Sequence, residues 1–93
     1  MKPKGYIVNY SNAVTLDTDF ILNDTTYVSS YIYIATAGDL VWMNSDGQLN
    51  FIENAQAGYH PINATQIVTS GSVGGVSQAT GASEISWFAS NFP

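Results

Sequence analysis

The segment Ser30-Tyr31-Ile32-Tyr33-Ile34-Ala35-Thr36 carries the strongest strand signal in the chain. Nearly all of its side chains are β-branched, aromatic or hydroxyl-bearing, and none of them breaks a strand. Side chains alternate across a strand, so Ile32 and Ile34 point to one face while Tyr31 and Tyr33 point to the other. We expect the isoleucines to face the core. The tyrosine face should be wetter and touch a neighbour, because tyrosine tolerates half-burial.

A β-hairpin is expected directly after this strand, with its turn at Asn44-Ser45-Asp46-Gly47. Two loops fit the turn, and they differ in register. A two-residue Asp46-Gly47 turn sets Trp42 against Phe51. A three-residue loop with a bulge at Gly47 is favoured, because it places two apolar pairs on one face, Met43 with Leu49 and Val41 with Phe51.

Short segments of strand-forming residues recur along the rest of the chain, about ten residues apart. Strands are predicted over residues 6–10, 13–16 (after a turn at Ser11-Asn12), 63–70 and 83–88, while 19–22 is either a strand or one helical turn. The predicted fold is an all-β, small antiparallel β-sandwich or barrel. Its predicted parts are a basic N-terminal tail (1–5), a β domain (6–71) and a Gly/Ser-rich segment with an aromatic C-terminal strand or arm (72–93).

Charge and composition exclude several classes of function. The chain has 93 residues, and its two cations, Lys2 and Lys4, precede a body with seven acids and no Lys or Arg. Nucleic-acid and membrane-surface binding both depend on such cations, so neither is expected. Cysteine is absent, and no apolar run is long enough to span a membrane. The first residues lack the apolar stretch of a signal peptide, so synthesis in the cytoplasm is expected.

Few residues suggest chemistry. His60 is the only histidine, and it precedes a proline, so we interpret it as an extended, hydrogen-bonded structural residue. Asp17 and Asp19 share a face in an extended segment, with Asp24 nearby, and carboxylate oxygens can bind Ca²⁺. The competing interpretation, solvated acids of an acidic protein, is favoured. We therefore expect no catalytic residue, no metal and no cofactor, and predict that the protein is not an enzyme.

The stretch from Tyr31 to Gly71 resembles a known group of proteins. Tyr31-Ile32-Tyr33-Ile34-Ala35-Thr36-Ala37-Gly38 is followed by Asp46-Gly47, then by Gly58-Tyr59-His60-Pro61-Ile62 and a strand ending Thr69-Ser70-Gly71. This order is similar to that of the small β-structured virion proteins of tailed bacteriophages, most closely the head-spike base and decoration proteins of capsids. The resemblance covers about 40 of the 93 residues. Residues 72–93 are additional to the pattern.

The resemblance implies a non-enzymatic structural protein of the virion, made in the host cytoplasm and exposed on the capsid surface. It would decorate or stabilise the head, or seat a head fibre. The implied partners are further copies of the chain in a five-fold or three-fold ring, the major capsid protein and a fibre protein. Two alternatives stay open: a tail or adaptor component of the virion, and a carbohydrate-binding β module that uses Trp42 and the strand tyrosines as a stacking platform.

Candidate interface residues lie at both ends of the chain and on the tyrosine strand. The segment 84–93 is rich in large apolar groups, so we expect an arm that docks on a neighbour. The glycines and serines of 71–81 would give that arm its reach. The predicted interface residues are Lys2, Lys4, Tyr31, Tyr33, Trp87, Phe88 and Phe92.

Overall fold

The computed structural model of this protein describes residues 10–89, and these residues form an all-β fold. Each of the strand pairs is antiparallel, as the sequence predicts. In chain order the strands are β1 (Tyr10–Ala13), β2 (Ile21–Leu22), β3 (Thr25–Thr26), β4 (Tyr31–Thr36), β5 (Gly38–Met43), β6 (Leu49–Ala55), β7 (Gly58–His60), β8 (Gln66–Ile67), β9 (Ser70–Val73), β10 (Val76–Ala79) and β11 (Ser83–Ala89).

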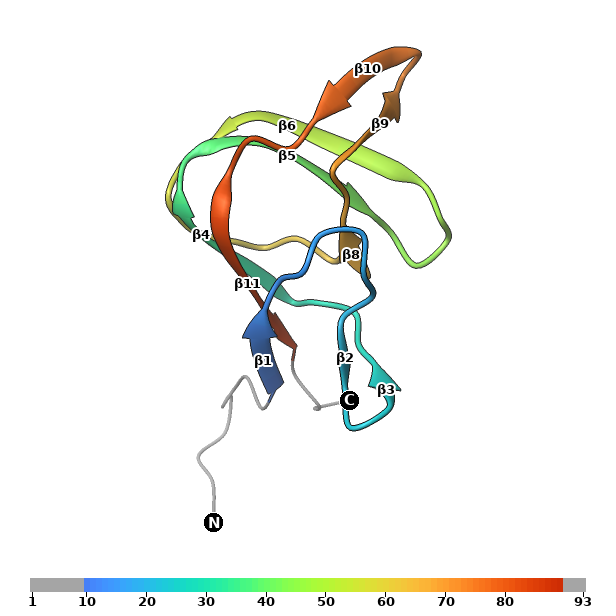
Figure 1. The fold of residues 1–93 in the computed structure, drawn as a ribbon, viewed down its shortest axis with the longest axis vertical. Helices are drawn as coiled ribbons and strands as arrows, with labels where there is room; N and C mark the ends of the chain where they lie inside the picture. The colour runs from blue at the N-terminus through green and yellow to red at the C-terminus, as the bar shows by residue number, and fades with distance from the viewer. Residues whose placement is uncertain (1–9, 90–93) are drawn as a thin grey trace.

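Two main sheets pack against each other in a sandwich-like arrangement that does not close into a barrel (Figure 1). The larger sheet has the order β1-β11-β4-β7 and the smaller one has the order β6-β5-β8. Two separate hairpins, β2-β3 and β9-β10, form the small sheets. Residues 10–89 include no helix, and so none of the length and apolarity needed to cross a membrane.

A bent two-stranded ribbon joins the two main sheets. The chain passes from β4 into β5 across Ala37, and it returns from β6 into β7 across Gln56 and Ala57. As a result β4 pairs with β7 in the larger sheet, and β5 pairs with β6 in the smaller one. The bend lets one hairpin contribute to both layers of the sandwich, so the two layers cannot separate without breaking it.

Gly38 makes this bend possible. A Cβ atom at this position would lie 2.5 Å from the Ala82 nitrogen and 2.6 Å from the Gly81 carbonyl carbon, both backbone atoms. The close approach is held by two hydrogen bonds, because the N–H groups of Gly81 and Ala82 both donate to the Asp39 carbonyl oxygen, at 2.8 and 3.0 Å. The Asp39 carboxylate in turn accepts from the Asn54 N–H at 2.8 Å. Glycine is therefore required where the two layers meet.

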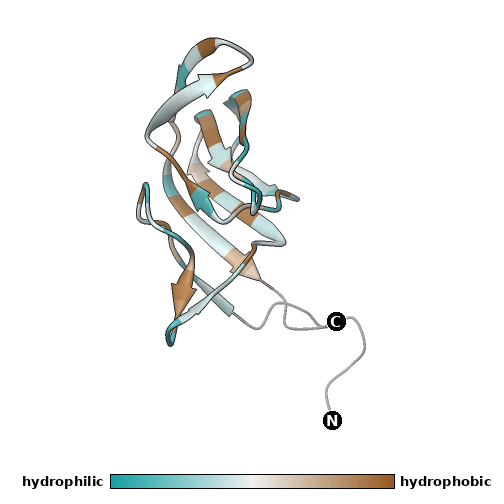
Figure 2. Ribbon diagram, turned by 90° about the vertical axis from the view of Figure 1, so that its right-hand side faces the viewer, coloured by the Kyte–Doolittle hydropathy of each residue, from teal (hydrophilic) through white to brown (hydrophobic). Residues whose placement is uncertain are grey.

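The core lies between the two main sheets. Ile32 and Ile34 are fully buried there, while Tyr31 on the same strand is 43% exposed. The predicted assignment of the two faces of this strand is confirmed. Hydrophobic and polar residues alternate along the strands, so the brown and teal segments interleave in Figure 2. This alternation is what lets each sheet turn one face to the core and the other to solvent.

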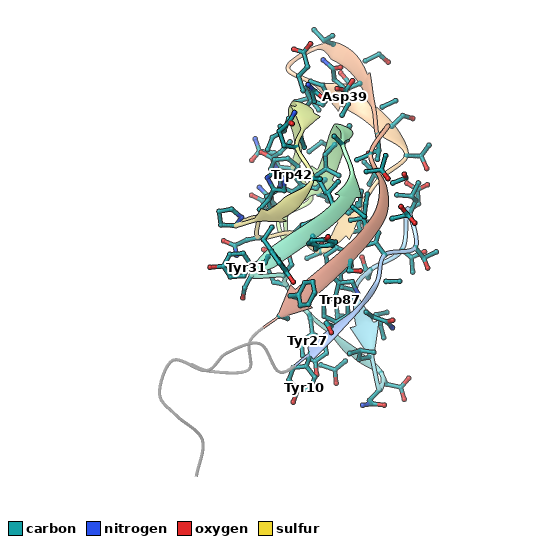
Figure 3. The ribbon with its side chains drawn as sticks, turned by 90° about the vertical axis from the view of Figure 1, so that its left-hand side faces the viewer. Tyr10, Tyr27, Tyr31, Asp39, Trp42 and Trp87 are labelled. Atoms are coloured by element: carbon teal, nitrogen blue, oxygen red, sulfur yellow. The ribbon has the colours of Figure 1, made fainter. Side chains whose placement is uncertain are left out.

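Four aromatic rings stack against one another from this core outward, and we call them the inner stack: the buried Phe20 and Trp87, and the partly buried Tyr27 and Tyr10. The ring centroids of Phe20 and Trp87 are 5.3 Å apart and nearly parallel, with an interplanar angle of 10°. Tyr27 lies 5.7 Å from Trp87 and 4.7 Å from Tyr10. Figure 3 shows the last three of these side chains close together beside β1 and β11. The stack joins β1 and β11 to the segments on either side of the β2-β3 hairpin.

The hairpin after β4 has the favoured bulged loop. The Gly47 N–H donates to the Asn44 carbonyl oxygen at 3.0 Å, and the Asn44 N–H donates to the Gln48 carbonyl oxygen at 2.9 Å. Gly47 has φ +84°, a left-handed conformation that glycine adopts without strain. Both predicted apolar pairs form, Val41 with Phe51 and Met43 with Leu49. The opposite face of this hairpin, with Leu40 and Ile52, is the one that packs on the main core.

The face bearing Val41 and Leu49 is covered by the segment that we expected to be a flexible connector. Residues 71–81 belong largely to the hairpin β9-β10, whose turn residues Gly74 and Gly75 both have positive φ. Thr80 fastens this hairpin, because the Val41 N–H donates to its hydroxyl at 3.0 Å. At Gly71 there is no space for a Cβ atom beside the Leu49 side chain. The expectation of a flexible linker is wrong, since this stretch forms a hairpin that covers the face of the β6-β5-β8 sheet turned away from the main core.

Two local predictions also need correction, and the alternative left open for residues 19–22 is decided in favour of a strand. Ser11 and Asn12 lie within β1 and not in a turn, and the turn comes later, at Asp17, which has φ +61°. Residues 19–22 end in the short strand β2 and contain no helical turn. The segment 63–70 is not one strand, because only Gln66 and Ile67 pair with β5. In each case long-range hydrogen bonds replace the local pattern, as when the Asp17 N–H donates to the Ile67 carbonyl oxygen at 2.8 Å.

The C-terminal part of the described chain is a central strand and not an arm. β11 lies between β1 and β4 in the larger sheet and pairs with both. Ile85 and Trp87 are buried in the core. The prediction of an interaction arm is therefore wrong for residues 84–89, and the strand alternative holds. β11 completes the sheet that β4 begins, so residues before and after position 71 share one sheet.

Candidate functional site

An exposed cluster of aromatic side chains covers the outer surface of the larger sheet. We call it the aromatic face and define it by Tyr31, Tyr33, Tyr59 and Phe88. Strand register brings these residues together: Tyr33 lies opposite Tyr59 in the β4–β7 pair, and Tyr31 lies opposite Phe88 in the β4–β11 pair. Paired residues point to the same side of a sheet. All four side chains therefore project away from the core that Ile32, their neighbour on β4, helps to fill.

Three of the four rings of the aromatic face, those of Tyr33, Tyr59 and Phe88, are in contact. The centroids of Tyr33 and Tyr59 are 4.8 Å apart with the planes tilted by 54°, and those of Tyr59 and Phe88 are 5.5 Å apart at 62°. The second contact crosses over β4, since Tyr59 belongs to β7 and Phe88 to β11. Tyr59 remains 63% exposed and Tyr31 43% exposed. Edge-to-face contacts of this kind fix the rings in position while leaving much of their surface in water.

The aromatic face carries no charge of its own. The seven carboxylates all lie within residues 10–89, and none of them belongs to this cluster. Glu84, on the same strand as Phe88, lies at the opposite end of β11, where its carboxylate accepts a hydrogen bond from the Thr36 hydroxyl at 3.1 Å. An uncharged patch on an acidic body is the part of the surface where two copies can approach with least repulsion.

His60 supports the aromatic face from the other side of β7. Its Nε2 atom lies 2.6 Å from the Gln56 carbonyl oxygen. A carbonyl oxygen only accepts hydrogen bonds, so Nε2 carries the proton and donates. This bond spans the bend between β6 and β7 and holds the start of β7, where Tyr59 is placed. The prediction that His60 is extended and hydrogen-bonded is confirmed.

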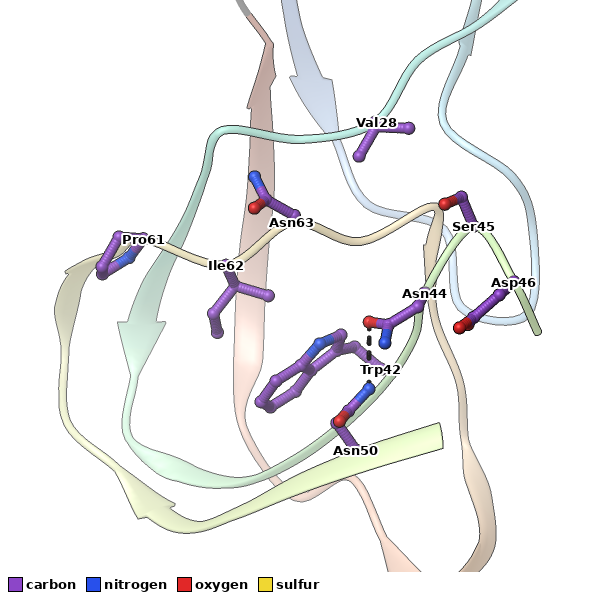
Figure 4. A pocket seen from close by; sticks show the side chains of 9 residues that line it. All are labelled: Val28, Trp42, Asn44, Ser45, Asp46, Asn50, Pro61, Ile62 and Asn63. Atoms are coloured by element: carbon purple, nitrogen blue, oxygen red, sulfur yellow. Dashed lines mark hydrogen bonds between the residues drawn. The ribbon is translucent and has the colours of Figure 1, made fainter. Parts of the chain in front are cut away.

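A second feature is a pocket of about 400 Å³ beside Trp42 (Figure 4). The Trp42 ring is half-buried and lies along one wall, next to the hydrogen-bonded pair Asn44 and Asn50. The hairpin β5-β6 supplies this side of the pocket, while the segments before β4 and after β7 supply the other. The remaining lining residues are Val28, Ser45, Asp46, Pro61, Ile62 and Asn63.

The buried hydroxyl of Ser29 fixes the far side of this pocket. It donates to the Ile62 carbonyl oxygen at 2.6 Å and accepts from the Ala64 N–H at 2.9 Å. The Asn63 side chain donates to the Ser29 carbonyl oxygen at 2.8 Å. Because Ser29 is only 1% exposed, these bonds are shielded from water. The pocket walls are thus held together by a buried polar clasp.

The acidic residues near the start of the chain bind other parts of the protein. Both carboxylate oxygens of Asp17 accept from Thr69, at 2.6 Å from its hydroxyl and 2.8 Å from its N–H. The hydroxyl bond, helped by the backbone bond, lowers the pKa of Asp17 below its ordinary value of 3.8. Asp19 accepts from the Gln66 side chain at 2.7 Å. Within residues 10–89 there is no group of three His, Cys, Asp or Glu side chains placed to hold a metal ion.

The structure brings together three of the predicted interface residues, Tyr31, Tyr33 and Phe88. Trp87 is wrongly predicted as an interface residue, because it is 2% exposed and points into the inner stack. Lys2, Lys4 and Phe92 lie outside the described residues. Tyr59 was missed, although its position after Gly58 and before His60-Pro61 marks a strand re-entry. Only the pairing of β7 with β4 places it beside Tyr33.

Comparison with known proteins adds no assignment: no family model, no curated protein and no solved structure matches this chain.

Proposed function

We propose that this chain is a non-enzymatic structural protein of a bacteriophage particle that assembles with further copies of itself through the aromatic face. The observation that carries the proposal is this cluster of uncharged rings on an otherwise acidic body, with Tyr31 and Tyr59 exposed and Tyr59 in contact with two neighbouring rings. Aromatic residues are enriched at protein–protein interfaces, where they bury much area at a small cost in side-chain entropy. The resemblance of residues 31–71 to capsid head-spike base and decoration proteins supports the placement in a virion.

The second copy of this chain is the occupant that the charges favour. With seven acids and no Lys or Arg, residues 10–89 repel an identical chain at most orientations. The aromatic face avoids that repulsion and supplies the apolar area that drives association. In a closed ring of five or three copies, the aromatic face of each copy would contact a different surface of the next copy. The major capsid protein and a fibre protein are the proposed neighbours of such a ring in the particle, whether at the head or as a tail or adaptor component.

The assembly is tested by native mass spectrometry and light scattering of the full chain at micromolar concentration. We expect a closed oligomer of five or three copies, and we expect Tyr59→Ser to shift it to monomer, because Tyr59 is the most exposed ring of the aromatic face. Val76→Ser is the matched control, since Val76 is 56% exposed but lies on β10. A wild-type chain that stays monomeric, or equal dissociation by both variants, would contradict the proposal.

The placement in a phage particle has its own test, which is the gene neighbourhood. We expect the gene for this chain to lie beside a gene for a major capsid protein or a fibre. The chain should then co-sediment with capsids of that phage, and Tyr59→Ser should lower its occupancy. A neighbourhood without virion genes, or an absence from purified particles, would refute the placement without touching the assembly result.

A further inference from the structure

The pocket beside Trp42 combines an aromatic ring with several amide groups, which the aromatic face lacks. Its volume of about 400 Å³ is within the range of about 300–1,000 Å³ that small-molecule sites occupy. None of its lining residues belongs to the aromatic face. The two surfaces therefore differ in position and in chemistry, and a ligand of the pocket does not depend on self-assembly.

The indole of Trp42 gives the pocket a flat apolar wall. Its ring is half-buried and packs partly against the main core, so its orientation is held. None of the hydrogen bonds found among residues 10–89 uses its indole N–H. The face of an aromatic ring is electronegative and attracts the weakly positive C–H groups of a flat ligand. Val28, Pro61 and Ile62 add apolar contact on the facing side (Figure 4).

The amide pair next to the ring is fixed by its own hydrogen bond and still has free polar atoms. The Asn50 Nδ2 group donates to the Asn44 Oδ1 atom at 3.0 Å and to the Gln48 carbonyl oxygen at 3.4 Å. Among the bonds of residues 10–89, the Asn44 Nδ2 group donates none and the Asn50 Oδ1 atom accepts none. One free donor and one free acceptor thus belong to the same amide pair, and hydroxyl groups can pair with either because they donate and accept.

Two further side chains of the pocket, Asn63 and Asp46, each have one polar atom in a hydrogen bond and a second one available to a ligand. The Asn63 Nδ2 group donates to the Ser29 carbonyl oxygen at 2.8 Å. Among the hydrogen bonds of residues 10–89, none uses the Asn63 Oδ1 atom. Asp46 accepts from the Gln48 N–H with Oδ1 at 3.0 Å and has its second oxygen free. Each residue is held by one bond and presents another polar atom at the pocket. Such fixed groups bind a ligand at a low entropy cost, because their rotamers are already set.

We propose that this pocket binds a neutral hexopyranose residue of a glycan. A pyranose has one face of C–H groups, which matches the Trp42 ring, and an edge of hydroxyls, which matches the amides. Among the lining residues within 10–89, the Asp46 carboxylate is the only charged group, and none of these lining residues is basic. Sialylated and other acidic sugars would therefore be repelled. The proposal stands apart from self-assembly, since the aromatic face contributes nothing to the pocket.

The two tryptophans allow a direct test by NMR titration of the full chain. Their indole N–H signals report on Trp42 in the pocket and on Trp87 in the core, which serves as an internal control. Lactose, cellobiose and maltose are the probes, and 3′-sialyllactose is the acidic comparison. We expect at least one neutral probe to shift the Trp42 signal at millimolar concentration and to leave Trp87 unmoved. No shift with any neutral probe, or equal binding of 3′-sialyllactose, would overturn the proposal.

Asn44→Asp is the variant that separates binding from folding. An aspartate keeps the Oδ1 atom that accepts from Asn50, but it replaces the free donor with a negative charge. We expect affinity for the neutral probe to fall by about tenfold or more, with the fold unchanged. Tyr59→Ser, which lies outside the pocket, should bind the probe as the wild type does. Unchanged affinity of Asn44→Asp, or lost affinity of Tyr59→Ser, would refute the site, and neither result bears on the oligomer.

Discussion

The inner stack and the aromatic face lie on opposite sides of the same sheet and differ in how their rings meet. Rings of the inner stack are close to parallel, with interplanar angles of 10° to 26°. Rings of the aromatic face are tilted by 54° and 62°. The first cluster has two buried rings, Phe20 and Trp87, while the second leaves Tyr59 63% exposed. One sheet thus uses aromatic residues in two ways, for stability inside and for contact outside.

Adjacent residues of β11 show how close these two roles are in sequence. Trp87 is 2% exposed and contacts two rings of the inner stack, whereas Phe88 is half-buried and contacts Tyr59. Their environments differ because adjacent side chains point to opposite faces of a strand. Large apolar residues in the last strand therefore need not form an arm. A central strand places such residues on both faces, and only the outer ones remain for a partner.

The largest expected effect is the loss of the fold when the chain is truncated after Gly81. This deletion removes β11, the strand that separates β1 from β4 and that carries Trp87 into the inner stack. We expect the truncated chain to lack a cooperative unfolding transition and the NMR dispersion of a folded β protein. A soluble, β-rich monomer that has merely lost assembly would show instead that the segment is an arm.

Substitution of the two neighbours in β11 separates the roles of the two clusters. Trp87→Ala should cost about 3–5 kcal/mol in the free energy of unfolding, because it empties a packed core site. Phe88→Ser should cost roughly 1 kcal/mol, since the ring lies on the outer face of the sheet and is only partly buried. Phe88→Ser should nevertheless weaken self-assembly, which Trp87→Ala has no direct reason to do while it stays folded. Urea titration and light scattering measure both quantities, and equal stability losses would break the comparison.

A substitution at Gly38 tests the bend between β4 and β5, where the two main sheets meet. Gly38→Ala places a methyl group against the backbone of Gly81 and Ala82, which cannot move without breaking their bonds to Asp39. We expect a loss of about 3 kcal/mol in the free energy of unfolding. Gly47→Ala is a useful reference, because nothing lies within 4 Å of a Cβ there and only the positive φ opposes it. A smaller loss at Gly38 than at Gly47 would contradict this account of the bend.

The clasp of Ser29 holds the segment that brings Tyr27 to the inner stack. Ser29→Ala removes the hydroxyl that pairs with the Ile62 carbonyl oxygen and the Ala64 N–H, and it leaves both buried groups unsatisfied. We expect a loss of about 1–3 kcal/mol, measured by thermal or urea unfolding. Ser77→Ala on the exposed strand β10 is the control and should be close to neutral. A neutral Ser29→Ala would mean that the clasp does not anchor this segment.

The smallest expected effect depends on pH. Asp17 holds the loop that leads to Phe20, and its pKa is lowered in the folded state by the two bonds from Thr69. A lowered pKa means that this stabilisation is complete above the ordinary pKa of 3.8 and is lost as the pH falls through the lower folded-state value. Asp17→Asn should therefore reduce stability at neutral pH and converge on the wild type in acid. A constant difference across this range would exclude the carboxylate as the cause.

Local patterns were enough to predict part of the fold and part of the aromatic face. The alternation in β4 predicts that the isoleucines are buried and the tyrosines exposed, and the turn residues around Gly47 predict the register of the β5-β6 hairpin. Both depend on residues within a few positions of each other. The partners of these elements could not be predicted in this way. Tyr59 reaches the aromatic face only because a three-residue strand pairs with β4, and the pocket beside Trp42 exists only because Ser29 ties two distant segments together.

The sequence by itself determined that the protein is all-β, which face of β4 is apolar and where its main hairpin turns, because these properties follow from side-chain alternation and turn geometry. The tertiary structure alone decided that the glycine-rich stretch 71–81 forms the cover β9-β10 and that β11 enters the centre of a sheet. The physical reason is that a strand satisfies its backbone hydrogen bonds only with a partner, and the choice of partner depends on the whole chain. A composition rich in glycine and serine makes a segment flexible while it is unpaired, but strand pairing in the folded protein orders it.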